Sequence, residues 1–208
     1  DTNQPVIRTI PRRGYQLTTE ARFDNPRTPV PLVAGGPVPG RGDWLLVRLL
    51  TQSAVSETWL ARQQGNQTDH VYRFCRDEDY LRLLQREVTL LRYLRETLAD
   101  RGDTARIVDW QLDEPPYFLE LEYATRGSLA EWSAAQGGLP QIPQARRLGW
   151  MAQTAAALSG VHAAGIVHRQ LSAAAILLDG EEDDPRVKLG EFGLGELCDR
   201  SRLEALKI

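Results

Sequence analysis

The chain has 208 residues, of which 42% are hydrophobic and 25% are charged, so it is long enough for one ordinary soluble domain and a short appendage. Its formal net charge of -3 provides no overall positive field that would hold nucleic acid or an anionic membrane surface. No apolar run approaches the roughly 20 residues that span a bilayer, and the first residues lack the pattern of a signal peptide.

Residues 6–17, VIRTIPRRGYQL, predict two short strands joined by a tight turn, because β-branched residues precede a Pro-Arg-Arg-Gly corner. The segment resembles the last hairpin, the wing, of a response-regulator-type winged-helix DNA-binding domain. That resemblance implies that Arg12 and Arg13 contact the DNA backbone or minor groove. An ordinary solvated hairpin tip is the alternative. We expect residues 1–17 to be the end of such a domain, and DNA to be a partner through the upstream part of a longer protein.

Residues 18–43 are rich in proline and glycine and follow neither the helical nor the strand period, which is typical of a linker. After this segment, patterns with the periods of strands and helices follow one another. Strands are predicted at residues 44–50, 57–62, 70–74, 105–110, 117–123, 175–178 and 187–190, and long helices at residues 77–98 and 141–164.

Four motifs in this order resemble those of a bacterial Ser/Thr protein kinase. HVYRF (70–74) stands where that family has V-A-x-K, and LELEYATRGSLAEW (119–132) is similar to its hinge. GIVHRQLSAAAILL (165–178) has the form of the catalytic loop H-R-D-L-x-x-x-x-N-I-L-L, and VKLGEFG (187–193) that of V-K-L-x-D-F-G. The resemblance covers about residues 44–208.

The resemblance implies an α+β, kinase-like fold with two lobes. We expect residues 44–122 to form an N-lobe of five antiparallel strands and one long helix. Residues 123–208 should form the hinge and part of a mainly helical C-lobe. We expect this lobe to be truncated, because the chain ends inside the segment that precedes the A-P-E motif.

The family binds ATP beneath a Gly-rich loop, and the resemblance places that loop at residues 49–62. Its three glycines are Thr51, Ser53 and Ser56 here, so the cradle for phosphate should be weak or lost. The phosphate-pairing lysine is Arg73, and its carboxylate partner would be Glu87; two unrelated surface charges are the alternative. The other nucleotide positions that the resemblance implies are Val71, Leu121, Glu122, Ala124 and Leu177.

The positions that would carry the chemistry are altered as well. Gln170 replaces the aspartate that accepts the proton of the substrate hydroxyl, and an amide is no base. Ser172 replaces a phosphate-contacting lysine, and Ala175 replaces an asparagine that holds a metal ion. Glu191 replaces the metal-binding aspartate and is longer by one methylene, which Mg²⁺ tolerates poorly. We therefore expect binding of ATP and Mg²⁺ to be weak or absent.

Packing positions of the family are retained in His168, Phe192 and Leu91, so the shape should persist. This combination favours a pseudokinase, a kinase-like domain that acts as a scaffold or switch and not as an enzyme, in a transcription-regulator fusion with protein partners. A divergent ATP-dependent Ser/Thr kinase, for phosphoryl or nucleotidyl transfer, is the alternative, and a decayed product is a third. The two widely separated cysteines match no zinc or disulfide pattern, which suits the cytoplasm.

Overall fold

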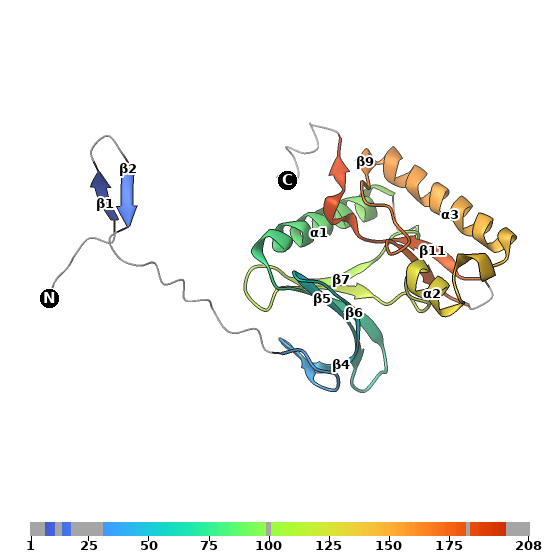
Figure 1. Ribbon diagram of the computed structural model, residues 1–208, viewed down its shortest axis with the longest axis horizontal. Helices are drawn as coiled ribbons and strands as arrows, with labels where there is room; N and C mark the ends of the chain where they lie inside the picture. The colour runs from blue at the N-terminus through green and yellow to red at the C-terminus, as the bar shows by residue number, and fades with distance from the viewer. Residues whose placement is uncertain (1–6, 11–13, 18–30, 99–100, 182–183, 199–208) are drawn as a thin grey trace. The chain divides into compact units, whose positions relative to one another are not determined.

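A computed structural model describes residues 7–10, 14–17, 31–98, 101–181 and 184–198, and it divides the chain into two compact units, Asp1–Pro31 and Leu32–Ile208. In the first unit, β1 (Ile7–Ile10) pairs antiparallel with β2 (Gly14–Leu17), which confirms the predicted hairpin (Figure 1). The DNA-contact residues proposed for its tip, Arg12 and Arg13, lie outside the described residues.

The second unit is built on a six-stranded antiparallel sheet with the strand order β3-β4-β5-β6-β8-β7 (Figure 1). Its strands, in chain order, are β3 (Pro37–Val38), β4 (Arg41–Gln52), β5 (Ser56–Gln63), β6 (Asp69–Cys75), β7 (Ile107–Gln111) and β8 (Phe118–Glu122). Five of them are the strands expected for the N-lobe.

The sixth strand, β3, differs from the prediction that a linker extends to residue 43. Val38 is buried and packs with Trp44 and Leu46 of β4, so this part of the Pro/Gly-rich segment belongs to the sheet. Gly40, with φ +79°, turns the chain between the two strands in a conformation that other residues rarely adopt. Glycine and proline here mark a tight hairpin, and the remainder of the expected linker up to residue 30 is outside the described residues.

The helix α1 (Glu78–Leu98) covers one face of this sheet, as its apolar period predicted. Its residues Leu84 and Val88 pack against Leu119 and Leu121 of β8. The opposite face of the sheet is filled by aromatic side chains that include Tyr72. The alternation along each strand thus separates an aromatic layer from the layer that faces α1.

The remaining part of the unit contains α2 (Leu129–Ala135), a short 3₁₀ helix η1 (Leu139–Gln141), α3 (Gln144–Ala163), and two short two-stranded sheets. Strand β9 (Ile166–Val167) pairs with β12 (Glu196–Leu197), and β10 (Ile176–Asp179) with β11 (Arg186–Leu189); the 3₁₀ helix η2 (Phe192–Leu194) lies between β11 and β12. The predictions of α3, β10 and β11 are confirmed, whereas α2, β9 and β12 were not predicted.

One apolar core joins this part to α1. Leu90, Leu91 and Leu94 of α1 pack in a single cluster with Val161 of α3 and Phe192 of η2. The helix therefore packs against both the sheet and the loops around η2. Among the described residues, no helix has both the length and the apolar composition needed to cross a membrane.

Candidate functional site

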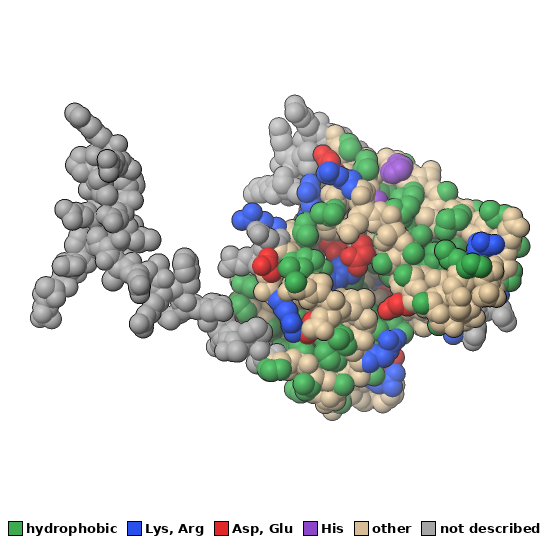
Figure 2. All heavy atoms as spheres, in the orientation of Figure 1, with side chains coloured by type: hydrophobic (Ala, Val, Ile, Leu, Met, Phe, Trp, Pro, Cys, Tyr) green, Lys and Arg blue, Asp and Glu red, His purple; other side chains and the backbone are tan. Residues whose placement is uncertain are grey.

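The candidate site lies where β6 and α1 approach the loop that follows β11. Arg73 is in the middle of β6, opposite Thr58 of β5 and Leu119 of β8, and its neighbours Tyr72 and Phe74 point to the aromatic face. Because side chains alternate along a strand, Arg73 points to the face that α1 covers. Figure 2 shows acidic side chains gathered near the middle of the visible face of this unit.

Arg73 binds two carboxylates at once. Its Nη1 donates to Oε2 of Glu87 at 2.8 Å, and its Nη2 donates to Oε1 of Glu191 at 2.5 Å. The side chains of Arg73 and Glu87 are 9% and 2% exposed, while that of Glu191 is 38% exposed. The alternative that Arg73 and Glu87 are unrelated surface charges is therefore wrong. We call Arg73, Glu87 and Glu191 the Arg73 triad.

The triad combines one positive charge with two negative charges in a poorly solvated place. Burial opposes the charge of Arg73, but Glu87 and Glu191 outweigh this effect and raise the pKa of Arg73. Burial raises the pKa of Glu87, Arg73 works against this, and the nearby charge of Glu191 adds to it. Arg73 thus stays charged, and Glu87 takes up a proton more readily than an ordinary glutamate.

The turn between β4 and β5, which occupies the place of the Gly-rich loop, is closed by one of its own side chains. Oγ of Ser53 accepts hydrogen bonds from the backbone N–H groups of Val55 at 3.2 Å and Ser56 at 3.0 Å, and the N–H of Ser53 donates to the carbonyl of Ser56 at 2.9 Å. A phosphate cradle needs such N–H groups to point at the ligand. Here Ser53 already occupies two of them, and Thr51 is exposed at the end of β4.

Glu57 is a buried carboxylate beside this turn that the sequence analysis missed. Its Oε1 accepts hydrogen bonds from Gln52 at 2.9 Å and from Nη2 of Arg76, and its Oε2 accepts one from Nε1 of Trp59 at 3.1 Å. These contacts join β4, β5 and the residue after β6, and they hold the turn in one conformation. Its burial could have been predicted from the alternation along β5, because Glu57 lies on the same face of the strand as the buried residues Trp59 and Ala61.

The loop between β9 and β10 contains the three altered catalytic positions, Gln170, Ser172 and Ala175. Gln170 is exposed. Ser172 closes the turn, because its Oγ and its carbonyl oxygen accept hydrogen bonds from the N–H of Ala175 at 3.3 and 3.1 Å. Ala175 is fully buried and presents only a methyl group. This loop therefore offers neither a general base nor a metal ligand at these positions.

The packing residues, in contrast, lie as predicted. The rings of His168 and Phe192 are 4.6 Å apart, both side chains are buried, and Leu91 belongs to the same core as Phe192. Nε2 of His168 lies 2.8 Å from the carbonyl oxygen of Gly190, to which it donates. Glu191 has φ 60° and ψ 47°, a left-handed conformation that directs its side chain to Arg73.

The positions assigned to the adenine side of the site lie close together. Val71 and Leu177 are half-buried and pack against the apolar cluster that contains Leu121. The N–H of Glu122 donates to the carbonyl of Arg106 at 3.0 Å, and the carbonyl of Ala124 accepts the N–H of Gly127 at 2.9 Å, so each of these two hinge residues has one backbone group bound within the protein.

Asp179, at the end of β10, fixes the hinge to the second half of the unit, a role that the sequence did not indicate. Its Oδ1 accepts hydrogen bonds from the N–H and the hydroxyl of Thr125 at 3.0 and 3.1 Å, and its Oδ2 lies 2.7 Å from Nζ of Lys188. Burial would raise the pKa of Asp179, but the hydrogen bonds from Lys188 and Thr125 outweigh it and lower the pKa.

The side chains present do not fit Mg²⁺-bound ATP in the way that the resemblance implies. Arg73 and Glu191, which would contact phosphate and metal, neutralise each other, and Ala175 supplies no ligand atom. In the part of the chain that the structure describes, no group of three or more His, Cys, Asp or Glu side chains is placed to hold a metal ion. What the site does provide is an ion-paired connection between the sheet, α1 and the loop after β11.

Comparisons with known proteins agree with the motifs. Residues 70–206 match the protein kinase domain family. The chain is 29% identical over 174 residues to CBL-interacting protein kinase 22 of Oryza sativa subsp. japonica. This alignment covers 76% of this chain and 38% of that protein. The chain is 27% identical over 128 residues to serine/threonine-protein kinase pkn3 of Myxococcus xanthus. That alignment covers 56% of this chain and 22% of the relative. The chain therefore spans less than half of the length of these relatives.

Proposed function

Because this chain belongs to the protein kinase family, we propose that its kinase-like domain is a pseudokinase that acts as a scaffold or switch. The observation that carries the proposal is the Arg73 triad. Both terminal nitrogens of Arg73 are bound to protein carboxylates, at 2.8 and 2.5 Å, where the family uses a lysine for phosphate. A nucleotide phosphate would have to displace Glu191 and leave that carboxylate without its cation.

The other altered positions support the same proposal. Phosphoryl transfer depends on positioning and electrostatic stabilisation more than on covalent chemistry. Gln170 removes the base, Ala175 removes a metal ligand, and Ser53 takes up N–H groups of the phosphate loop. Residues that act as a unit are not additive, so the losses do not multiply, but each acts against transfer. ATP and Mg²⁺ should accordingly bind weakly or not at all.

The proposed setting is a bacterial transcription regulator in which a winged-helix DNA-binding domain precedes the pseudokinase. The sequence of residues 6–17 and the β1–β2 hairpin support this setting. DNA would be bound by the upstream domain, and protein partners would act on the pseudokinase, in the cytoplasm. The family match begins only at His70, after the segment where a Gly-rich loop would lie, which is in keeping with loss of nucleotide handling.

A divergent ATP-dependent Ser/Thr kinase, for phosphoryl or nucleotidyl transfer, is the second candidate, and one observation favours it. Arg73 pairs with the helix carboxylate Glu87, and His168 packs on Phe192, so the arrangement of sheet, helix and loops that the family uses is retained. Such a kinase would need Glu191 to leave Arg73 and bind Mg²⁺.

Thermal unfolding in millimolar ATP, with and without Mg²⁺, separates the two candidates. For the pseudokinase we expect no Mg²⁺-dependent stabilisation, whereas a ligand at 100 times its Kd would stabilise by about 2.7 kcal/mol. The matched variant restores the family residues by Arg73→Lys, Gln170→Asp, Ala175→Asn and Glu191→Asp. We expect this variant to gain a Mg²⁺-dependent shift. A shift in the unaltered protein that Glu191→Gln abolishes would refute the pseudokinase and support the kinase.

A further inference from the structure

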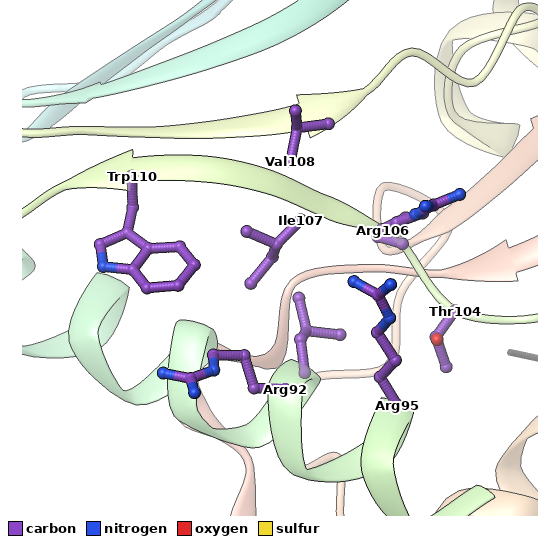
Figure 3. Close-up of a pocket in the computed structure, with 9 residues that line it drawn as sticks. Arg92, Arg95, Thr104, Arg106, Ile107, Val108 and Trp110 are labelled. Carbon is purple, nitrogen blue, oxygen red and sulfur yellow. The ribbon is translucent and has the colours of Figure 1, made fainter. Parts of the chain in front are cut away.

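A pocket remote from the Arg73 triad lies between the second half of α1 and the strand β7. It has a volume of about 160 Å³ and is lined by Leu91, Arg92 and Arg95 of α1, by residues 104–108 and by Trp110. In Figure 3 the side chains of Arg92 and Arg95 extend from the helix toward the strand, with Arg92 below the ring of Trp110 and Arg95 directed toward Arg106.

The pocket is basic because its arginines outnumber the acids that pair with them. Nη1 of Arg106 pairs with Glu122 at 3.1 Å. Within the described ranges, no ion pair involves Arg92 or Arg95, although Glu96 follows in the same helix. The carboxylates of Asp103 and Asp109 nearby are paired with Arg101 and Arg41. The C-terminal end of α1 offsets part of one positive charge, which leaves a net positive site.

Apolar side chains stand beside these charges. Trp110 is 37% exposed, and in Figure 3 its ring and the side chain of Ile107 point from β7 toward α1, whereas Val108 points away from the helix. The guanidinium of Arg92 lies 5.4 Å from the ring centroid of Trp110, a contact that orients both groups. Exposed tryptophan and arginine are the residue types that most often anchor protein interfaces.

The size of the pocket indicates what kind of ligand it takes. Pockets for small organic ligands and cofactors have volumes of about 300–1,000 Å³. A volume of about 160 Å³ suits a side chain or two of a polypeptide laid across the surface. Nucleic acid is disfavoured, since the chain has a net charge of -3 and this basic surface is small.

We propose that this pocket is a docking site for an acidic segment of a partner protein, in which an aspartate or glutamate stands next to an aromatic or aliphatic side chain. The carboxylate binds Arg92 and Arg95, and the apolar side chain packs on Trp110 and Ile107. Leu91, which lines the pocket, follows Glu87 by one turn of α1, so a docked segment touches the helix that carries part of the Arg73 triad. The docking site requires no bound nucleotide and is independent of the proposed function.

A display library of random 12-residue peptides, selected on the whole chain, tests this inference. We expect enriched peptides that contain acidic residues next to an aromatic or aliphatic residue. Their affinity should fall about fivefold or more in Arg92→Gln and in Arg95→Gln, as for interface arginines that contribute more than about 1 kcal/mol. It should also fall when the acidic residues of the peptide are replaced by their amides, and with rising salt concentration.

Arg82→Gln is the matched control, since Arg82 is exposed on the same helix and does not line the pocket. Thermal unfolding of each variant verifies that its fold is intact, and both pocket arginines are exposed, so their replacement should not unfold the domain. Failure to enrich any acidic peptide would overturn the inference. Equal affinity of the peptides for Arg82→Gln, Arg92→Gln and Arg95→Gln would also overturn it. So would enrichment of peptides that bind elsewhere on the chain and whose affinity these substitutions do not change.

Discussion

Replacing Arg73 by methionine tests the triad most directly, because methionine keeps the unbranched stem but has no charge. Glu87, which is 2% exposed, would lose its cation, and removal of one partner from a buried ion pair costs about 3–5 kcal/mol. The pair with Glu191 adds little, since that carboxylate is 38% exposed and exposed pairs are worth about 0–1 kcal/mol. We expect the midpoint of thermal unfolding to fall by about 6–20 °C, at about 2–4 °C per kcal/mol for a domain of this size.

The assay is thermal unfolding followed by circular dichroism at pH 8 and at pH 5. Burial already raises the pKa of Glu87 with Arg73 in place, and loss of the cation raises it further. A carboxyl group whose folded pKa is raised stabilises the fold below its unfolded pKa, and this stabilisation is lost as the pH rises through the folded pKa. The deficit of Arg73→Met should therefore be larger at pH 8 than at pH 5.

Two further variants make the result decisive. Glu191→Gln should lower stability by no more than about 1 kcal/mol. The double variant Arg73→Met, Glu87→Gln should recover much of the loss, because removing both partners leaves no buried charge. The reasoning is refuted if Arg73→Met costs no more than Glu191→Gln at both pH values, or if the double variant is less stable than Arg73→Met.

Three smaller predictions follow from the other contacts of the site. Ser53→Ala removes the acceptor of the turn between β4 and β5, so hydrogen exchange of the Val55 and Ser56 amides should become faster, and unchanged exchange in mass spectrometry would contradict this. Glu57→Gln should lower the free energy of unfolding by about 1–3 kcal/mol, since it removes a buried charged acceptor from Arg76. The control is Glu131→Gln, the same substitution at an exposed glutamate that accepts a hydrogen bond from the N–H of Ser128, and it should cost less. Asp179→Asn should cost about 1 kcal/mol at pH 7. Because the folded pKa of Asp179 is lowered, its contribution exists above the unfolded value near 3.9 and is lost as the pH falls through the folded pKa, so variant and parent should converge in acid.

The fold could be predicted wherever the sequence carried a long periodic signal. The apolar period of α1 and the strands β4 to β8 gave elements close to those observed. Elements of two residues, such as β9 and β12, show no period and were missed. The helix α2 was missed for another reason: its start was read as part of the hinge, although Ser128 and Glu131 form a capping box that is visible in the sequence.

The candidate site was predictable position by position, but its contacts were not. The resemblance to protein kinases assigned Arg73, Glu87 and Glu191 to one site, and in the structure the three side chains meet. The sequence motifs did not indicate that Oγ of Ser53 accepts hydrogen bonds from N–H groups of its own turn or that Glu57 is buried. Both features depend on the path of the loop between β4 and β5. Hydrogen bonds across a turn are set by backbone geometry that residue types alone leave open.

The two triad residues that differ from the family motifs, Arg73 and Glu191, are best considered together because they bind each other. Arginine for lysine adds a planar group with several donors, and glutamate for aspartate adds one methylene to the carboxylate. Considered singly, each change alters a position that the resemblance assigns to phosphate or metal. Considered jointly, they lengthen both partners, and the structure shows them in contact at 2.5 Å while Arg73 also keeps Glu87 at 2.8 Å. The contact links β6, α1 and the loop after β11 through protein charges alone, and under the proposed function it holds these three elements together without a nucleotide.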